Sequence, residues 1–469
     1  MIVQESYSVR HLTNGVARVY IKNSALLRQN GYVAGAAFSV TGKNRALKLV
    51  LNEEEGSKTV NNTARGELVE VRSKATGDAL KGFSRVVVTF SKGVILIEVP
   101  LVELMRVTRE ASIKKALLTG KPLRKASVCS GVGTLAYQMK QGLESEGVKT
   151  QMAFAVDSDK LAISLQVEGN PIWSNPTKDA QALAVDIRDI DLSKIKHVHY
   201  LEIGYPCNGQ STLSPSERRD LNHPEVGTLF ISICALIKAL NPAILVLENA
   251  VPFLTSDTLS LMQRELSELG YRFESIVLNG YAHGDFEERE RACVVGVSQG
   301  LPELNLNQFT PPATVERRIF DDVREEIADD SDCWSKMTHV TKKLSDPRLN
   351  FKHNLVNGTD DKIAAISAGY ASPRIGSPMV PHPNYEENGL QRLFTNKEHS
   401  GIRGIPSKLW GVLKKVGNGE HPLVSKRGNT SHVHRLLGNG VSPKAWFDLS
   451  AFIGRYLNGF YPQQLELAV

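Results

Sequence analysis

The sequence GYPCNGQS (residues 204–211) places Cys207 directly after an apolar run, residues 198–203, that is predicted to be a β-strand. A thiol just past a strand end stands where an open α/β sheet presents reactive groups to a ligand. Such a thiol, once ionised, is a nucleophile. A buried structural thiol is the alternative, because free cysteine is among the most buried residue types. The choice depends on what the rest of the chain brings to the same place.

Acidic residues end two further predicted strands. Asp157 follows residues 151–156, and Asp186 follows residues 183–185. A carboxylate at the tip of the second strand can accept hydrogen bonds from ribose hydroxyls, and the next one can accept from an adenine amine. Each acid alone also fits a helix N-cap or a solvated turn. Acids at successive strand ends favour a nucleotide-like ligand.

A glycine-containing turn joins the first of these strands to a helix. Residues 124–128 run into CSGVG (residues 129–133), and an amphipathic helix is expected over residues 136–145. In this arrangement a helix N-terminus and bare backbone face a nucleotide-like ligand. The GxG pattern alone also fits a dinucleotide-dependent oxidoreductase. However, residues 134–139 lack the third glycine that its fingerprint requires.

The elements that must position these groups alternate along the chain. A helix is predicted over residues 224–239, followed by a continuous apolar strand, residues 243–247, that ends at Glu248. A second helix and two more strands follow, at residues 259–269, 275–279 and 292–297. Alternating strands and helices predict a doubly wound, Rossmann-like α/β sheet.

The composition is that of a globular protein in a reducing compartment. The 469 residues are 41% hydrophobic and 23% charged, and we find no membrane span or signal peptide. The five cysteines form no CxxC pair, and the histidine pairs 197/199 and 432/434 have no further ligand at metal-binding spacing, so no metal site is expected. We therefore expect a cytoplasmic protein, which would be nucleoid-associated given a bacterial, phage or mobile-element source.

Other segments lie outside the predicted sheet. Residues 1–105 alternate like a β-rich domain and are weakly similar to the swapped-hairpin barrels of bacterial transition-state regulators, which bind DNA as dimers. This domain is a candidate module for DNA binding, for dimerisation or for another protein contact. Residues 106–123 are expected to be a basic linker, either solvated or in contact with phosphates. Residues 300–395 lose periodicity and predict a small irregular lobe.

In order and spacing, these stretches resemble the motifs of DNA (cytosine-5) methyltransferases. The similarity covers about residues 124–298 and 395–457, with a core over residues 124–299 and a return to it over residues 396–469. The matching residues are SGVG (130–133), DSD (157–159), Asp186, PCNGQS (206–211), EN (248–249), RER (289–291), RGIP (403–406) and GNGV (438–441).

The resemblance implies a reaction and its residues. Cys207 would attack carbon 6 of a flipped-out cytosine, Glu248 would act on ring nitrogen 3, and Arg289 and Arg291 would hold the base and support the loop. S-adenosylmethionine would be the cofactor and methyl donor. A monomer would bind double-stranded DNA, and residues 300–395 would be the target-recognition region. The resemblance also suggests a role in restriction–modification. The implied cofactor-binding residues are Ser130, Gly131, Gly133, Asp157, Asp186 and Asn439.

The sequence departs from the family pattern at five positions. The family usually has glutamine at 208 and 287, an aromatic residue at 129, glycine at 134 and serine at 440, where this chain has Asn208, Glu287, Cys129, Thr134 and Gly440.

Two alternatives to a DNA methyltransferase stay open. One is an RNA cytosine methyltransferase, and the long N-terminal domain and variable region favour DNA over it. The other is a catalytically silent nucleic-acid-binding relative, against which the intact Cys207, Glu248 and Arg291 argue.

Overall fold

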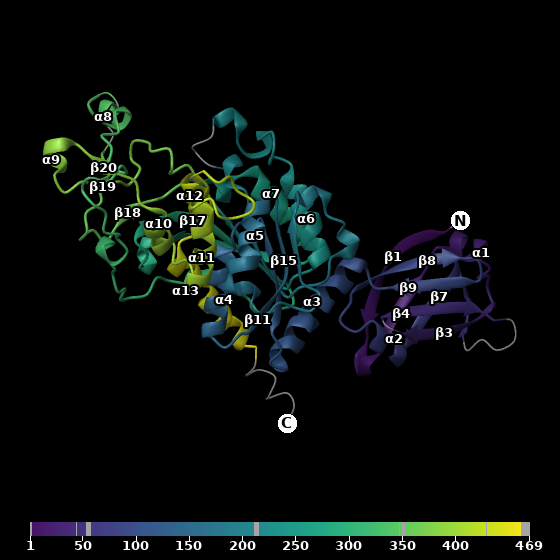
Figure 1. Cartoon of the computed structure of the whole chain (residues 1–469). Coiled ribbons are helices and arrows are strands. Elements are labelled where there is room, and N and C mark those ends of the chain that lie inside the picture. Colours follow the sequence, from purple (N-terminus) through teal and green to yellow (C-terminus); the bar gives the residue numbers. More distant parts are fainter. Residues whose placement is uncertain are drawn as a thin grey trace. The chain divides into compact units, whose positions relative to one another are not determined.

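The structure is a computed structural model of the chain, which divides into two compact units, Met1–Thr108 and Arg109–Val469 (Figure 1). Each unit is described by itself. Ser211, the last residue of the predicted cysteine loop, lies outside the described residues. The described residues are 2–43, 45–52, 58–210, 215–346, 348, 352–427 and 429–460.

The N-terminal unit contains a sheet of nine strands in the order β5-β3-β4-β9-β8-β1-β2-β7-β6. Only Val60 separates β5 from β6, so the chain itself joins the two edges of the sheet and closes it. Inward-facing residues alternate along the strands, as Val69 and Val71 do, and form a separate hydrophobic core. The strands are β1 (Val3–His11), β2 (Ala17–Ile21), β3 (Ala37–Lys43), β4 (Ala46–Leu51), β5 (Lys58–Thr59), β6 (Asn61–Thr63), β7 (Gly66–Ser73), β8 (Arg85–Ser91) and β9 (Val94–Glu98).

This unit repeats one motif twice. Strand β2 leads through helix α1 (Ser24–Gln29) to the hairpin β3–β4, and β7 leads through α2 (Lys74–Ala79) to the hairpin β8–β9. Asn23 and Ser73 cap the two helices in the same way, through a side-chain oxygen that accepts a backbone N–H. Both halves come from one chain, so closing the sheet requires no second copy.

The second unit, Arg109–Val469, is built on a seven-stranded sheet in the order β12-β11-β10-β13-β14-β17-β15. The first five of these strands are parallel, and β17 runs antiparallel to both of its neighbours. Every residue of β14 is buried, as expected for a strand covered on both faces. The predicted α/β sheet is thus confirmed. Its strands are β10 (Leu123–Val128), β11 (Thr150–Asp157), β12 (Gln181–Ala184), β13 (Tyr200–Gly204), β14 (Ile244–Asn249), β15 (Tyr271–Asn279) and β17 (Glu290–Ser298).

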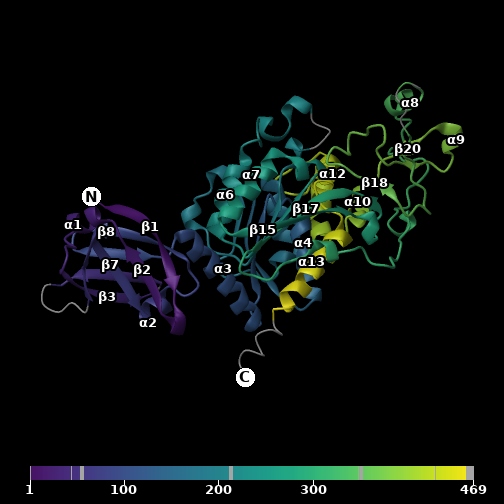
Figure 2. The same cartoon turned by 180° about the vertical axis from the view of Figure 1, so that it is seen from behind.

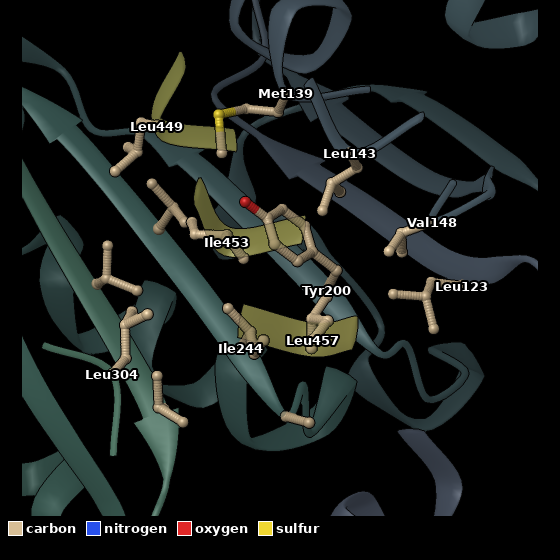
Figure 3. Packing of buried hydrophobic residues seen from close by; sticks show 14 of the residues in the cluster. Leu123, Met139, Leu143, Val148, Tyr200, Ile244, Leu304, Leu449, Ile453 and Leu457 are labelled. Carbon is tan, nitrogen blue, oxygen red and sulfur yellow. The ribbon is translucent and has the colours of Figure 1, made fainter. Parts of the chain in front are cut away.

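Helices from both ends of this unit cover the sheet. Met139 of α4 and Leu449 and Ile453 of α13 pack over Tyr200 of β13 (Figure 3). Helix α13 of the C-terminal segment therefore packs into the same core as α4 and β13. Helix α6 begins five residues later than predicted, because residues 224–228 form turns. The helices are α4 (Thr134–Ser145), α5 (Lys160–Gly169), α6 (Leu229–Leu240), α7 (Asp257–Glu268), α10 (Asn396–Ile402), α11 (Ser407–Gly417), α12 (Thr430–Gly438) and α13 (Pro443–Asn458).

The segment expected to be a basic linker is largely helical. Helix α3 (Leu101–Leu118) covers most of residues 106–123. Arg109 is buried, donates hydrogen bonds to the carbonyls of Leu269 and Gly270, and lies 3.9 Å from the ring centroid of Tyr271. This arginine anchors the helix to the second unit and is not available for phosphates. Its burial could not be read from a run of charges.

Residues 300–395 contain only short elements, and the longest described one is helix α8 (Thr338–Leu344). Phe320, Val356 and Tyr370 belong to a small hydrophobic cluster that holds the region together. Strand β18 (Ile363–Ala364) pairs with β16 (Glu287–Glu288) in a separate two-stranded sheet, and β16 directly precedes β17 of the seven-stranded sheet. None of the described helices has the length and apolar character needed to cross a lipid bilayer.

Candidate active site

Cys207 begins a short 3-10 turn, Cys207–Gly209, at the carboxyl end of β13. Gln210 closes the turn, with its N–H 2.9 Å from the Cys207 carbonyl oxygen, and its side chain donates to Asp220 Oδ1 at 3.1 Å. Before the cysteine, Tyr205 is buried and stacks on Phe253 with a centroid distance of 5.5 Å. Both sides of the cysteine are therefore anchored to the core, while the Cys207 side chain itself is exposed.

Glu248 lies on the neighbouring strand at the same edge of the sheet. The register pairs Gly204 of β13 with Glu248 of β14, and β17 brings Cys293 opposite Glu248 from the other side. Arg291, two residues before Cys293, places its Nε 3.1 Å from Glu248 Oε1. The structure thus brings the cysteine loop, the acid and one of the two predicted arginines to one place.

The surrounding protein raises the pKa values of both Glu248 and Cys207. Burial raises the pKa of the Glu248 carboxyl above its ordinary value, and the guanidinium of Arg291 opposes this shift. Desolvation by the surrounding protein also raises the pKa of the Cys207 thiol, and the Glu248 carboxylate adds to the rise. Both groups therefore keep their protons to a higher pH than the same side chains do in water.

Arg289 is buried behind this pair. Its Nη1 donates to the Ile366 carbonyl at 3.3 Å and its Nη2 to the Gly438 carbonyl at 3.2 Å. Any side chain at 438 would collide with the backbone of Ser367, because an added Cβ would lie 2.4 Å from its oxygen. Arg289 and Gly438 thus join the 300–395 region to the C-terminal motif. Arg289 differs in this from Arg291, which points at Glu248.

The glycine turn is held by Asp157. Asp157 Oδ2 accepts from Gly131 N at 2.8 Å, and its Oδ1 accepts from Asp159 N at 2.9 Å. Gly133 has φ +79°, and a Cβ there would lie 2.8 Å from the Asn170 amide nitrogen, so only glycine fits without strain. Asp157 therefore shapes the turn at the same time as it presents a carboxylate to the space beside it.

The remaining acids divide between two roles. Asp159 caps α5, accepting from Leu161 N at 2.9 Å, and its other oxygen lies 2.8 Å from Arg435 Nη2. Asp186 is more exposed, caps a 3-10 turn and lies 3.0 Å from Arg188. Asp159 and Asp186 therefore both act as N-caps, as the alternative interpretation predicted. The Asp186 carboxylate is also partly exposed to solvent.

Both Asp157 and Asp186 lie close to Cys129. Burial raises the pKa of the Cys129 thiol, and the carboxylates of Asp157 and Asp186 add to the shift. Ser130 follows directly, with its N–H 3.1 Å from the Val156 carbonyl oxygen. The carboxyl ends of β10, β11 and β12, which are far apart in the sequence, therefore lie next to one another.

Asn439 is the C-cap residue of α12. Its N–H donates to the Arg435 carbonyl at 3.1 Å. The following residue, Gly440, lies against the first turn of α4, where an added Cβ would be 3.0 Å from Thr134 Oγ1. Two of the departures from the family pattern are therefore in contact: the larger residue at 134 faces the smaller one at 440.

The residues around the glycine turn fit a nucleoside-bearing cofactor. A Cβ on Gly131 would meet no atom within 4 Å, so open space borders its backbone. Asp157 contacts the Gly131 N–H and Asp186 lies close to Cys129, and acceptors of this kind suit ribose hydroxyls and an adenine amine. Among the described residues, no group of three His, Cys, Asp or Glu side chains is arranged to hold a metal ion.

Sequence reasoning missed three residues that support the site. Gln166 and Asn170 donate to the carbonyls of Gly131 and Val132, and so fix the glycine turn from α5. Arg403 forms an ion pair with Glu287 behind Arg289 and Arg291. Arg403 stood in a recognised motif, but nothing in the sequence indicated its partner.

Comparisons with known proteins agree with this geometry. The profile of the family "C-5 cytosine-specific DNA methylase" matches residues 123–449. The chain is 24% identical over 314 residues to the type II methyltransferase M.MspI of Moraxella sp, covering 64% of this chain and 71% of that protein. It is 27% identical over 293 residues to M.HhaI of Haemophilus parahaemolyticus, covering 58% and 81%.

A shorter match and a structural likeness add to these. The chain is 32% identical over 228 residues to the type II methyltransferase M.NgoBI of Neisseria gonorrhoeae, covering 47% of this chain and 68% of that protein. The crystal structure of S. pombe Dnmt2 methyltransferase aligns with a TM-score of 0.52 at 17% identity, covering 72% of this chain and 99% of that one, which supports the fold. The chain belongs to the C-5 cytosine-specific DNA methylase family and is a DNA (cytosine-5)-methyltransferase that uses S-adenosylmethionine.

Proposed function

We propose that the protein methylates carbon 5 of a flipped-out cytosine within a specific sequence of double-stranded DNA, through a covalent bond between Cys207 and the base. The observation that carries this proposal is the pairing of Gly204 with Glu248, which sets the cysteine loop and the acid side by side with Arg291 3.1 Å away. A nucleophile, an acid and a fixed cation are the three groups that the reaction needs.

Each group has a distinct part in the chemistry. Cys207, as thiolate, forms a bond from Sγ to carbon 6, and the electron pair of the ring double bond becomes available at carbon 5. Glu248 gives a proton or a hydrogen bond to ring nitrogen 3, which prevents charge from building up on the base. Arg291 orients Glu248 and faces the pyrimidine carbonyl. Once carbon 5 carries the methyl group, its proton leaves to a water molecule. The electron pair of the C5–H bond re-forms the ring double bond, and the Sγ–C6 bond breaks to return the thiolate.

The cofactor side is formed by the residues around the glycine turn. When bound, S-adenosylmethionine supplies the methyl group. Gly131 and Gly133 allow close approach of the backbone, with Ser130 beside them, while Asp157 would accept from the ribose and Asp186 from the adenine amine. Asn439 closes the same space from α12. Arg289 acts as a positioning residue, because its contacts are to the backbone of Ile366 and Gly438.

Residues 300–395 take the place of the target-recognition region. The hydrogen bonds of Arg289 and Arg403 to the Ile366 carbonyl tie this region to the active site. Duplex DNA is favoured over RNA by the family match and by the length of this region. No recognised base sequence follows from its side chains.

The test is base-resolution mapping of 5-methylcytosine in host DNA and host RNA after expression in cells without their own cytosine methylation. We expect one short methylated DNA motif with the wild type and none with Cys207→Ala. Cys333→Ala, which removes an exposed thiol of the 300–395 region, is the matched control and should methylate as the wild type does. Methylated RNA without methylated DNA would overturn the choice of substrate.

A second measurement addresses the covalent bond. A duplex that carries the mapped motif with 5-fluorocytosine cannot lose a proton from carbon 5, so the Sγ–C6 bond should persist. We expect a complex that survives denaturing electrophoresis with the wild type and with Cys333→Ala, but not with Cys207→Ala. Methylation that survives in Cys207→Ala would overturn the mechanism while leaving the substrate assignment intact.

A further inference from the structure

The net positive charge of the protein resides in its N-terminal segment. Residues 1–100 contain 14 Lys and Arg against 8 Asp and Glu, and this excess equals the formal net charge of +6 of the whole chain. In the rest of the chain the numbers of basic and acidic residues are equal. A concentrated excess of this kind is the electrostatic footprint of a surface that binds a polyanion.

Four arginines lie next to one another on neighbouring strands of this unit. The register places Arg10 of β1 opposite Arg18 of β2, and Arg18 opposite Arg72 of β7. Arg85 of β8 faces Ser8, two residues along β1 from Arg10. Because β8, β1, β2 and β7 are successive neighbours in the sheet, the four arginines lie on four adjacent strands. Strands β1, β2, β7 and β8 are labelled in Figure 2. We call this set the arginine row.

The row faces outward. Strand neighbours such as Val9, Val19 and Val71 are buried in the core, so the alternating arginines point away from it. Arg10, Arg72 and Arg85 are exposed, whereas Arg18 is half-buried and lies 4.3 Å from the ring centroid of Tyr20.

No acidic side chain of the described residues neutralises this row through an ion pair. Like charges directly opposite each other on a sheet are destabilising. Within the described residues, no acidic side chain forms an ion pair with any member of the row, although Glu70 lies nearby, opposite Tyr20. Arg18 Nε is buried and has no hydrogen-bond partner among those residues. Lys58 adds a further cation, since its Nζ donates to the Arg72 carbonyl at 3.2 Å.

The dimensions fit a nucleic-acid backbone. Four neighbouring strands place the row across about 14 Å, from a spacing of about 4.8 Å between strands. A B-DNA major groove is about 12 Å wide, so the row is long enough to reach phosphates on both of its sides. Guanidinium groups are well suited to phosphate oxygens.

We propose that the arginine row is a second, sequence-independent contact surface for the phosphate backbone of duplex DNA. The choice of ligand rests on the proposed double-stranded DNA substrate. The row reads no bases. It holds DNA through charge, so its contribution to affinity must fall steeply as salt rises.

The test compares two triple variants of the full-length protein that lose the same charge. R10Q/R72Q/R85Q removes the exposed members of the row and keeps Arg18 on Tyr20. K48Q/K81Q/K92Q removes three exposed lysines of the same unit that lie outside the row. The probe is a fluorescein-labelled duplex of A·T pairs alone, which contains no cytosine and offers no target. Binding is measured by fluorescence anisotropy from 50 to 200 mM salt.

We expect the row variant to bind at least tenfold more weakly at low salt, with the slope of log K against log salt reduced by about 2.7, or about 0.9 for each lost phosphate contact. The lysine variant should keep its slope within about one of the wild type. Equal slopes for the two triples would overturn the proposal, as would tighter row-dependent binding of an RNA duplex of the same length.

Two further measurements cover a triple variant that does not fold and distinguish DNA binding from methyl transfer. The single variants R10Q and R72Q, each expected to lower the slope by about 0.9, replace the triple if it fails to fold. Methylation rates at saturating target DNA should match the wild type in the row variant, because the row is not part of the active site. Binding needs no methyl transfer, so loss of the row's effect and loss of the methylation activity are separate results.

Discussion

Glu287 and Arg403 form a buried ion pair, with Arg403 Nη1 2.7 Å from Glu287 Oε2, although 116 residues separate them in the chain. Glu287 stands where relatives usually have glutamine, and Arg403 is its nearer cation, since Arg289 Nη1 lies 3.7 Å from Glu287 Oε1. Both residues also hold Ile366: its N–H donates to Glu287 Oε1 at 2.7 Å, and its carbonyl accepts from Arg403 Nη2 at 2.8 Å. The pair thereby fastens the 300–395 region beside the active site.

Removing one partner of this pair should cost much more than removing both. Arg403→Met leaves a buried carboxylate, and we expect a loss of about 3 kcal/mol in the free energy of unfolding. Glu287→Gln/Arg403→Met restores a neutral pair, so the double variant should lose less than the sum of the two single variants. Urea denaturation of the four proteins measures this coupling. Additive losses would show that the two side chains do not interact energetically.

Gly440 and Thr134 should likewise depend on each other. Gly440→Ser alone places a Cβ 3.0 Å from Thr134 Oγ1 and 3.3 Å from its Cγ2, and we expect a cost of about 1–3 kcal/mol from overpacking. Thr134→Ala removes both of those atoms. The double variant Thr134→Ala/Gly440→Ser should therefore unfold at a higher temperature than Gly440→Ser. The same order is expected for S-adenosylmethionine affinity by calorimetry, and Thr134→Ala alone is the control.

The pH dependence of catalysis should reveal the proton on Glu248. The proposed mechanism needs Cys207 ionised and Glu248 protonated, and both pKa values are raised. Between those two pKa values the requirements offset each other, so wild-type kcat/KM should be level there. Glu248→Gln removes one requirement, so its lower kcat/KM should rise about tenfold per pH unit towards the pKa of Cys207.

Single-turnover methylation across pH 6 to 9 checks this difference, as a range of about three units suffices to separate the profiles. Glu268→Gln, which changes an exposed glutamate at the end of α7, is the matched control and should follow the wild type. Parallel profiles for the wild type and Glu248→Gln would exclude the proposed proton on Glu248.

Asp285 should make stability fall as pH rises. Burial raises the pKa of this carboxyl to about 7, although it accepts hydrogen bonds from Lys444 N at 3.1 Å and Ala445 N at 3.4 Å at the start of α13. Its unfolded pKa is about 3.9. A raised folded pKa contributes stability that is fully present below about pH 3.9 and is lost as pH rises through about 7.

Asp285→Asn removes this titration and keeps an acceptor for the helix N-terminus. Relative to the variant, the wild type should lose up to about 4 kcal/mol between pH 4 and pH 8, the upper limit for a shift of about three units. Denaturation midpoints of both proteins at several pH values give the difference. Asp332→Asn, at an exposed position of the 300–395 region, should show no such pH dependence relative to the wild type.

Much of the fold was predictable because its signals are local. The apolar run before Cys207, the glycine turn at 131–133 and the acids after β11 and β12 each depend on neighbours within a few residues. Strand periodicity and turn chemistry act over the same distance, so the order of elements and the edge that carries the site followed from them. Helix α3 was missed, because a run of charges does not reveal that Arg109 is buried.

What the sequence by itself determined is therefore the α/β sheet, the position of Cys207 and Glu248 at its strand ends, and the family. Only the tertiary structure decided which departures compensate each other, as in Glu287 with Arg403 and Thr134 with Gly440. It also decided that arginines from four strands form one row. The physical reason is that contacts between distant residues depend on strand register and helix packing, which the whole chain sets together, and no local pattern encodes them.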